Sequence, residues 1–160
     1  MSKNEEDAVS HLQQKFGAFP TGIWVALLAL AILMLAWGMQ AYSLLNWDHA
    51  VSLGIQNERF SDDPAETAWA LESWGVAMAD MLWPLPLTVV ALVGILRRRF
   101  FGLAAGLMAC AVGVYFPLFF AFQRWQTFRG TVFLTLMLFS APCLIAVIGL
   151  WANRSWFRDS

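Results

Sequence analysis

The sequence predicts an all-α integral membrane protein, built as a bundle of four transmembrane helices. Hydrophobic types make up 59% of its 160 residues and charged types 13%, whereas soluble domains carry about 45–50% and about 25%. Four apolar stretches reach the length of about 20 residues that a helix needs to cross a bilayer. These stretches are continuous rather than alternating, which favours helices over the strands of a barrel.

The four spans are expected near residues 22–45, 75–96, 101–122 and 132–151. Three of them contain no charged residue, and the second contains one, Asp80. The apolar core of the first span is much longer than the 7–15 or so residues of a signal peptide. We therefore expect the first span to remain in the mature protein as a helix.

The distribution of positive charge predicts the orientation of the spans, because Lys and Arg in short loops stay on the cytoplasmic side. An even number of spans places the N-terminal segment 1–21, the loop between the second and third spans, and the tail 153–160 on one side of the transmembrane domain 22–152. That side carries seven basic residues, which are Lys3, Lys15, Arg97, Arg98, Arg99, Arg154 and Arg158. The opposite side carries three, Arg59, Arg124 and Arg129. Both termini are therefore expected to be cytoplasmic.

The N-terminal segment permits two interpretations. Ala8, Val9, Leu12 and Phe16 recur at helical spacing, which is typical of a short amphipathic helix lying on the membrane surface. The same polar stretch also fits a solvated leader to the first span. The sequence leaves both interpretations open.

The loop 46–74 is the only long connection, and its orientation places it outside. It contains six acidic residues against the single cation Arg59, and these acids are Asp48, Glu58, Asp62, Asp63, Glu66 and Glu72. Asp63 can cap a helix, Pro64 suits the first helical position and Glu66 stands three residues after the cap. The pattern predicts a short helix that begins in the loop and leads into the second span.

Asp80 is the most informative residue, because it is the only acid or base inside a predicted span. An ionised carboxylate in the bilayer costs roughly 2.5–3.5 kcal/mol on insertion scales. Such a group needs a buried partner, a water-filled cavity or protonation. Because Asp80 lies only about one turn from the outer surface, a plain interfacial role is the competing interpretation.

Other polar side chains lie at a similar depth, and we expect them to line one outward-facing polar pocket. Arg124 is the expected ion partner of Asp80 or Glu72, since its guanidinium can bind a carboxylate through two hydrogen bonds. In the alternative interpretation each residue makes its own interfacial contact. The expected ligand-binding residues are Asp80, Glu72, Gln40, Tyr115, Arg124 and Trp83.

Prolines occur in three of the spans, at Pro84 and Pro86, at Pro117 and at Pro142. Each lacks a backbone donor and tends to kink a helix. Breaks of this kind can open a cavity or free carbonyl oxygens for a ligand.

Small residues form a stripe along the third span, which allows another helix to approach closely. The partner is either a helix of the same chain or a second copy of the chain in a homodimer. The stripe consists of Gly102, Gly106, Ala109 and Gly113.

Several chemistries are excluded by what the sequence lacks. The two cysteines, Cys110 and Cys143, lie inside spans without a CxxC motif, which argues against a thiol-oxidising membrane enzyme. No predicted span contains His, so a bis-His haem within the bundle would need histidines from another chain. His49 and Asp48 are weak candidates for an outer metal site. Nucleotide-binding and hydrolase motifs are missing, so no cofactor is predicted, although a bound lipid is compatible with the many aromatic residues.

The sequence favours an accessory or ligand- or lipid-binding subunit of a bacterial inner membrane, with a polar pocket around Asp80. Its expected partners are the bilayer and other membrane subunits, and a net charge of −1 argues against nucleic acid. The alternative is an oligomeric transporter or channel that uses Asp80 as its coupling carboxylate. An enzyme using Glu72 or Asp80 as acid or base ranks last, because no nucleophile or metal triad accompanies them.

Overall fold

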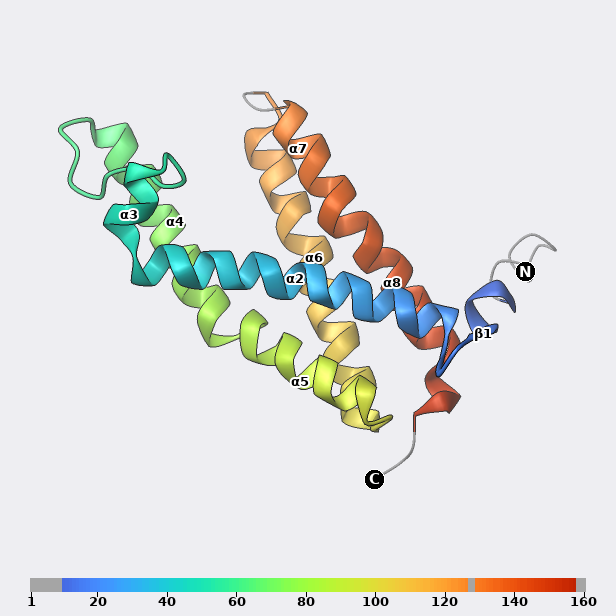
Figure 1. Cartoon of the computed structure of the whole chain (residues 1–160). Helices are drawn as coiled ribbons and strands as arrows, with labels where there is room; N and C mark the ends of the chain where they lie inside the picture. The colour runs from blue at the N-terminus through green and yellow to red at the C-terminus, as the bar shows by residue number, and fades with distance from the viewer. Residues whose placement is uncertain (1–9, 127–128, 158–160) are drawn as a thin grey trace. The chain divides into compact units, whose positions relative to one another are not determined.

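Four helices long and apolar enough to cross a membrane dominate the structure, which is a computed structural model describing residues 10–126 and 129–157. These helices are Thr21–Leu45, Pro64–Leu96, Phe100–Arg124 and Arg129–Ala152 (Figure 1). The sequence-based prediction of four helices long and apolar enough to span a membrane is confirmed. The second begins earlier than residue 75, because the helix expected in the loop continues into the span.

The first half of the described chain contains a short hairpin of β1 (Lys15–Phe16) and β2 (Phe19–Pro20), followed by α2 (Thr21–Leu45), α3 (Trp47–Ser52), α4 (Pro64–Leu82) and α5 (Pro84–Leu96). The second half contains α6 (Phe100–Arg124), α7 (Arg129–Thr135), the π-helical turn η1 (Leu136–Ser140), α8 (Ala141–Ala152) and the 3₁₀ turn η2 (Arg154–Trp156).

The N-terminal segment differs from the expected amphipathic helix. Residues 4–9 lie outside the described part of the chain, residues 10–13 are helical, and the chain then turns into the hairpin. Lys15 pairs with Pro20 and Phe16 with Phe19. Gly17 stands in the turn with a φ of 65°, a conformation that glycine adopts without steric cost. The helix therefore cannot continue to Phe16, which lies in a strand instead.

The start of α4 follows the predicted capping pattern, with one difference. The Asp63 carboxylate accepts a hydrogen bond from the Ala65 amide at 2.9 Å, and Pro64 occupies the first helical position. Glu66 does not reach back to the Asp63 amide. Its carboxylate instead accepts from the Ser61 hydroxyl at 2.6 Å, and the Ser61 oxygen accepts from the Asp63 amide at 3.2 Å. Ser61 therefore completes the cap between the two acids.

Two of the proline-containing spans are interrupted. The second changes from α4 to α5 at Trp83, directly before Pro84. The fourth contains the π-helical turn η1 just before Pro142. The third is different, because α6 continues through Pro117 without a break. A proline prevents one backbone hydrogen bond, but neighbouring geometry decides whether the helix is interrupted.

The chain divides into two compact units, residues 1–33 with 87–160 and residues 34–86. The charges of the described residues are segregated between them. In the first unit all charged side chains described are Lys or Arg, whereas the second contains seven acids and one cation, Arg59.

Glycines bring the helices of the first unit into close contact. A Cβ atom on Gly22 would lie 2.9 Å from the Cα atom of Gly149, and one on Gly102 would lie 2.2 Å from the carbonyl carbon of Gly94. A Cβ on Gly113 would lie 2.6 Å from the sulfur of Cys143. All four residues of the small-residue stripe are buried, and its three glycines face other helices of the same chain.

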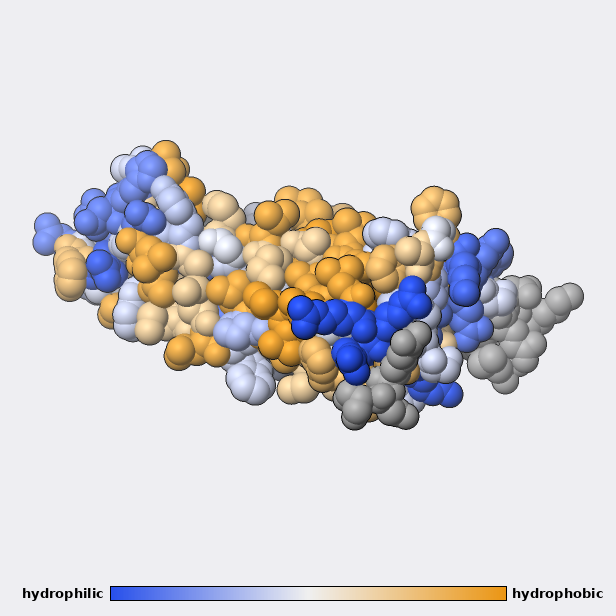
Figure 2. Space-filling model, turned by 60° about the horizontal axis from the view of Figure 1, so that its bottom comes forward, coloured by the Kyte–Doolittle hydropathy of each residue, from blue (hydrophilic) through white to orange (hydrophobic). Residues whose placement is uncertain are grey.

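Large apolar side chains remain exposed along the spanning helices, as expected of surfaces that contact lipid rather than water. Leu35 is 72% exposed and Phe122 is 88% exposed. Figure 2 shows apolar residues over much of the visible face, with hydrophilic residues gathered in separate patches. Exposure on this scale indicates burial in a membrane.

Candidate functional site

Asp80 lies in α4, two residues before the helix ends at Leu82. Its side chain is only 7% exposed. Its Oδ2 atom is buried and has no hydrogen-bond partner among the residues that the structure describes. Because buried polar atoms in folded proteins nearly all have a partner, this oxygen requires an explanation.

The break between α4 and α5 also affects the backbone carbonyl oxygen of Asp80. Trp83 departs from helical geometry, with φ −128° and ψ −65°. Pro84 follows Asp80 by four residues and has no N–H group, so it cannot donate to the Asp80 carbonyl as another residue would. Asp80 therefore presents an unpartnered carboxylate oxygen, and the proline withholds the usual helical donor from its backbone carbonyl.

The other expected pocket residues are distributed over both units. Gln40, Glu72 and Trp83 belong to the unit 34–86 with Asp80, and Tyr115 and Arg124 belong to the other unit. Glu72 is exposed on the same helix as Asp80, at a distance of eight residues, or roughly 12 Å along the helix axis. Trp83 is 59% exposed and Tyr115 is 69% exposed. The pocket as a whole, including an ion pair with Arg124, stays a prediction.

The weak metal candidates lie in α3 and its surroundings. The Nδ1 atom of His49 is hydrogen-bonded to the hydroxyl of Tyr42, and Asp48 is exposed beside it in sequence. Within residues 10–126 and 129–157 no group of three or more His, Cys, Asp or Glu side chains is arranged to hold a metal ion. The geometry here favours an aromatic–imidazole contact that ties α3 to the end of α2.

Cys110 and Cys143 meet inside the first unit. Both thiols are free and buried, and they lie next to each other. Cys110 lies on α6 and Cys143 on α8, so the thiol contact belongs to the packing of these two helices.

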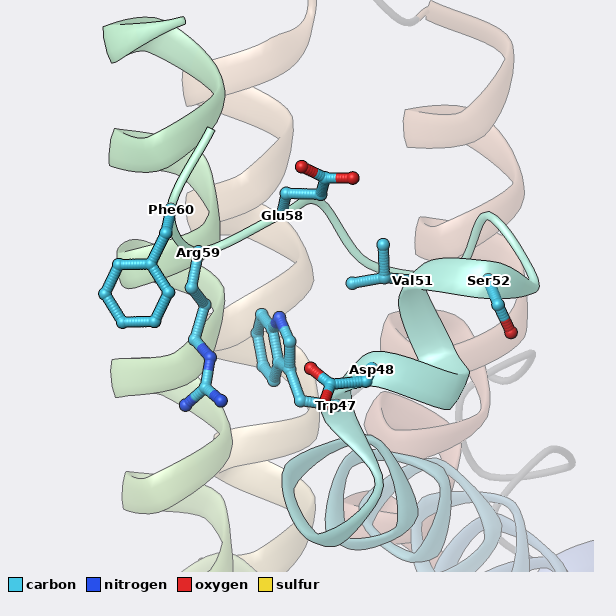
Figure 3. A pocket seen from close by; sticks show the side chains of 7 residues that line it. All are labelled: Trp47, Asp48, Val51, Ser52, Glu58, Arg59 and Phe60. Atoms are coloured by element: carbon cyan, nitrogen blue, oxygen red, sulfur yellow. The ribbon is translucent and has the colours of Figure 1, made fainter. Parts of the chain in front are cut away.

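A pocket that sequence reasoning missed lies in the unit 34–86, with a volume of about 440 Å³. It is lined by aromatic, acidic and basic side chains together (Figure 3). The lining residues are Trp47, Asp48, Val51, Ser52, Glu58, Arg59 and Phe60. This volume lies within the range of about 300–1,000 Å³ that is typical of ligand sites.

Trp47 organises this pocket. Its side chain is 4% exposed, and its indole nitrogen donates to the Asn57 carbonyl at 3.1 Å. The guanidinium of Arg59 lies 5.4 Å from the centroid of the Trp47 ring and 6.0 Å from that of Phe60. The mixture of aromatic and charged residues in this stretch is visible in the sequence, but the sequence does not indicate the turn that brings residues 47 and 59 together.

In comparisons with known proteins, no family model, no curated protein and no solved structure matches this chain. Its function has to be inferred from the side chains themselves.

Proposed function

We propose that this chain is an accessory or ligand-binding subunit of a bacterial inner membrane, with both termini in the cytoplasm and Asp80 as its recognition group. The four spanning helices and the basic α5–α6 connection support this placement. The acidic loop 46–74 then faces outward. The ligand site opens toward the same side.

One observation carries the proposal, and that is the buried Asp80 oxygen without a partner. Such a carboxyl costs free energy in a membrane whether it is ionised or only unsatisfied. A chain that retains it loses stability that an apolar side chain at this position would supply. Binding of a complementary group offsets this cost.

The chemistry of Asp80 defines the class of ligand. A carboxylate oxygen accepts hydrogen bonds, so the ligand presents a cation or a strong hydrogen-bond donor. A protonated amine, a guanidinium or a hydroxyl meets this requirement. The donor belongs to a small ligand, to a lipid headgroup or to a side chain of another membrane subunit.

Carbodiimide labelling tests this proposal on the full chain in detergent. Dicyclohexylcarbodiimide is apolar and reacts with protonated carboxyls in membranes, and intact-mass spectrometry counts the adducts. We expect one adduct that disappears in Asp80→Asn and persists in the control Glu72→Gln. Sodium, potassium and methylguanidinium serve as non-nucleophilic probes, and we expect at least one of them to slow the labelling several-fold. Labelling that survives Asp80→Asn, or that none of the probes slows, contradicts the proposal.

The break at Trp83 favours a second candidate function, an oligomeric transporter or channel. Interrupted membrane helices often supply carbonyl oxygens to a transported cation, and here the break lies beside an acidic side chain. Proteoliposomes with an internal pH- or cation-sensitive dye test this function. Flux that is lost in Asp80→Asn and retained in Glu72→Gln supports transport, whereas equal flux in both variants and in protein-free vesicles contradicts it.

A further inference from the structure

The pocket lined by Trp47, Asp48 and Arg59 contains opposite charges that do not form an ion pair with each other. In the described chain no ion pair joins Arg59 to Asp48 or to Glu58, although all three line the same space. In the view of Figure 3 the Arg59 guanidinium and the Asp48 carboxylate lie on either side of the Trp47 indole. The two charges are thus separated and open to a ligand that carries both signs.

Because of its position in the chain, the pocket lies at the level of the lipid headgroups. The spanning helix α2 ends at Leu45, and α3 begins at Trp47, so the pocket follows directly on the end of a span. Tryptophan is enriched at this level of membrane proteins. Apolar side chains around the pocket are uncovered, with Phe60 93% exposed, Leu53 56% exposed and Ile55 47% exposed. Exposed apolar groups beside charged ones suit the membrane interface better than bulk water.

From this arrangement we propose that the pocket binds the headgroup of a zwitterionic phospholipid with a primary ammonium, of the phosphatidylethanolamine type. The Arg59 guanidinium binds the phosphate through paired hydrogen bonds. The Asp48 carboxylate accepts hydrogen bonds from the ammonium, with Glu58 as a second acceptor at the rim. The acyl chains extend into the bilayer beside the end of α2.

The lining discriminates among headgroups. Two carboxylates against one guanidinium make the pocket unfavourable for an anionic headgroup such as phosphatidylglycerol. A choline headgroup has no N–H to donate, and it is bound best by open aromatic faces. Arg59 already lies over the Trp47 ring, so that face is not available for choline. A primary ammonium uses the carboxylates instead.

The pocket is formed before the lipid arrives. The Trp47 indole is held by its hydrogen bond to Asn57, and the amide of Ile55 donates to the Ala50 carbonyl at 2.9 Å. Arg59 is positioned by the Trp47 and Phe60 rings. Preorganisation of this kind reduces the entropy lost on binding.

The test is native mass spectrometry of the delipidated full-length protein in detergent. Equimolar phosphatidylethanolamine, phosphatidylcholine and phosphatidylglycerol with identical acyl chains compete for the protein, and bound lipid is identified by mass. We expect the ethanolamine lipid to be bound at least five-fold more than either competitor. Equal occupancy by the three, or a preference for the choline or glycerol headgroup, overturns the proposal.

Charge-matched variants locate the site. Arg59→Gln and Asp48→Asn should each reduce ethanolamine-lipid binding at least five-fold, and Arg59→Lys should retain an intermediate level. The controls Arg129→Gln and Asp62→Asn remove the same charges from exposed positions outside the pocket and should leave binding unchanged. A melting temperature measured on each variant separates lost binding from lost folding, and undiminished binding in folded Arg59→Gln overturns the proposal.

A soluble headgroup distinguishes the lipid from a free solute. Glycerophosphoethanolamine has the same charges without acyl chains, and we expect it to displace the lipid only at a concentration at least a hundred-fold higher. Displacement at equal concentration overturns the lipid assignment. Asp80→Asn should leave this binding unchanged, so failure here is distinct from failure of the Asp80 proposal.

Discussion

The guanidinium of Arg98 lies 4.9 Å from the centroid of the Trp156 ring. The same group donates a hydrogen bond to the Ala18 carbonyl at 3.4 Å, so Arg98 connects the α5–α6 turn with the N-terminal hairpin and the C-terminal turn η2. Its backbone is left-handed, with a φ of 57°. Hydrogen bonds from the Arg98 amide to Ile95 and from the Arg99 amide to Gly94, both 2.9 Å, define a Schellman motif in which Arg98 takes the position that glycine usually occupies.

Substitutions at Arg98 should therefore separate the side-chain contact from the backbone strain. Arg98→Ala loses the cation–π contact, worth about 0.5–1 kcal/mol, and keeps the unfavourable backbone, so the melting temperature should fall. Arg98→Gly loses the same contact but relieves a backbone cost of roughly 1–2 kcal/mol, so it should be close to the wild type. Thermal unfolding in detergent, followed by tryptophan fluorescence, measures both.

The control for this pair is Arg97→Ala, an exposed neighbour that should unfold like the wild type. If Arg98→Gly and Arg98→Ala are destabilised equally, the left-handed backbone of Arg98 is not a source of strain.

Arg98 also marks a limit of sequence reasoning. The three consecutive arginines predict the orientation of the spans, since only their charge enters that argument. The stacking of Arg98 on Trp156 depends on the position of η2 relative to the α5–α6 turn. No local pattern in residues 154–156 specifies this position. The apolar periods of the spans are local and strong, so the four helices could be predicted, whereas the contacts between distant segments could not.

The close approach of α5 and α6 makes Gly102 sensitive to the smallest substitution. In Gly102→Ala the new methyl group would lie 2.3 Å from the Ile95 backbone nitrogen, so the helices must separate at a cost of about 1–3 kcal/mol. Gly75→Ala is the matched control, because nothing lies within 4 Å of its Cβ position. That helical alanine should stabilise the protein by roughly 0.5–1 kcal/mol. Opposite shifts in melting temperature are expected, and a shift of the same sign in both contradicts the packing.

Gly113 offers a second-site test of the contact with Cys143. Gly113→Ala alone should lower the melting temperature, because its Cβ would lie 2.6 Å from the Cys143 sulfur. Removing that sulfur in the double variant Gly113→Ala, Cys143→Ala should restore part of the loss, since residues in contact are energetically coupled. Losses that simply add in the double variant would mean that the two side chains do not meet.

The candidate site was only partly accessible from the sequence. Asp80 could be selected because a lone acid in an apolar span is visible in the sequence itself. Its burial and the unpartnered Oδ2 atom depend on packing, which the sequence does not specify. The pocket around Trp47 could not be predicted, because the stretch from Leu53 to Ser61 has no apolar period and folds through turns and side-chain hydrogen bonds.

The cap of α4 should be a local source of stability. Asp63→Ala removes the acceptor for the Ala65 amide, which costs about 1 kcal/mol, and Ser61→Ala removes the hydroxyl that holds Glu66. Both should accelerate amide hydrogen exchange in residues 65–68 several-fold without changing exchange in α6. Asp62→Ala, an exposed neighbour, should exchange like the wild type. Unchanged exchange in Asp63→Ala would show that α4 does not depend on this cap.

The proposed orientation predicts which engineered cysteines can be reached from outside the cell. Cys110 is 0% exposed and Cys143 is 1% exposed, so the parent chain should not react with a membrane-impermeant maleimide and provides the background. Asp62 and Ser155 are exposed and lie at opposite ends of the spans in the proposed topology. Asp62→Cys should be labelled in intact cells, whereas Ser155→Cys should be labelled only after lysis. The reverse pattern would place the basic α5–α6 turn outside. Labelling of both positions in intact cells would mean that the chain crosses the membrane an even number of times between them, instead of the three crossings proposed.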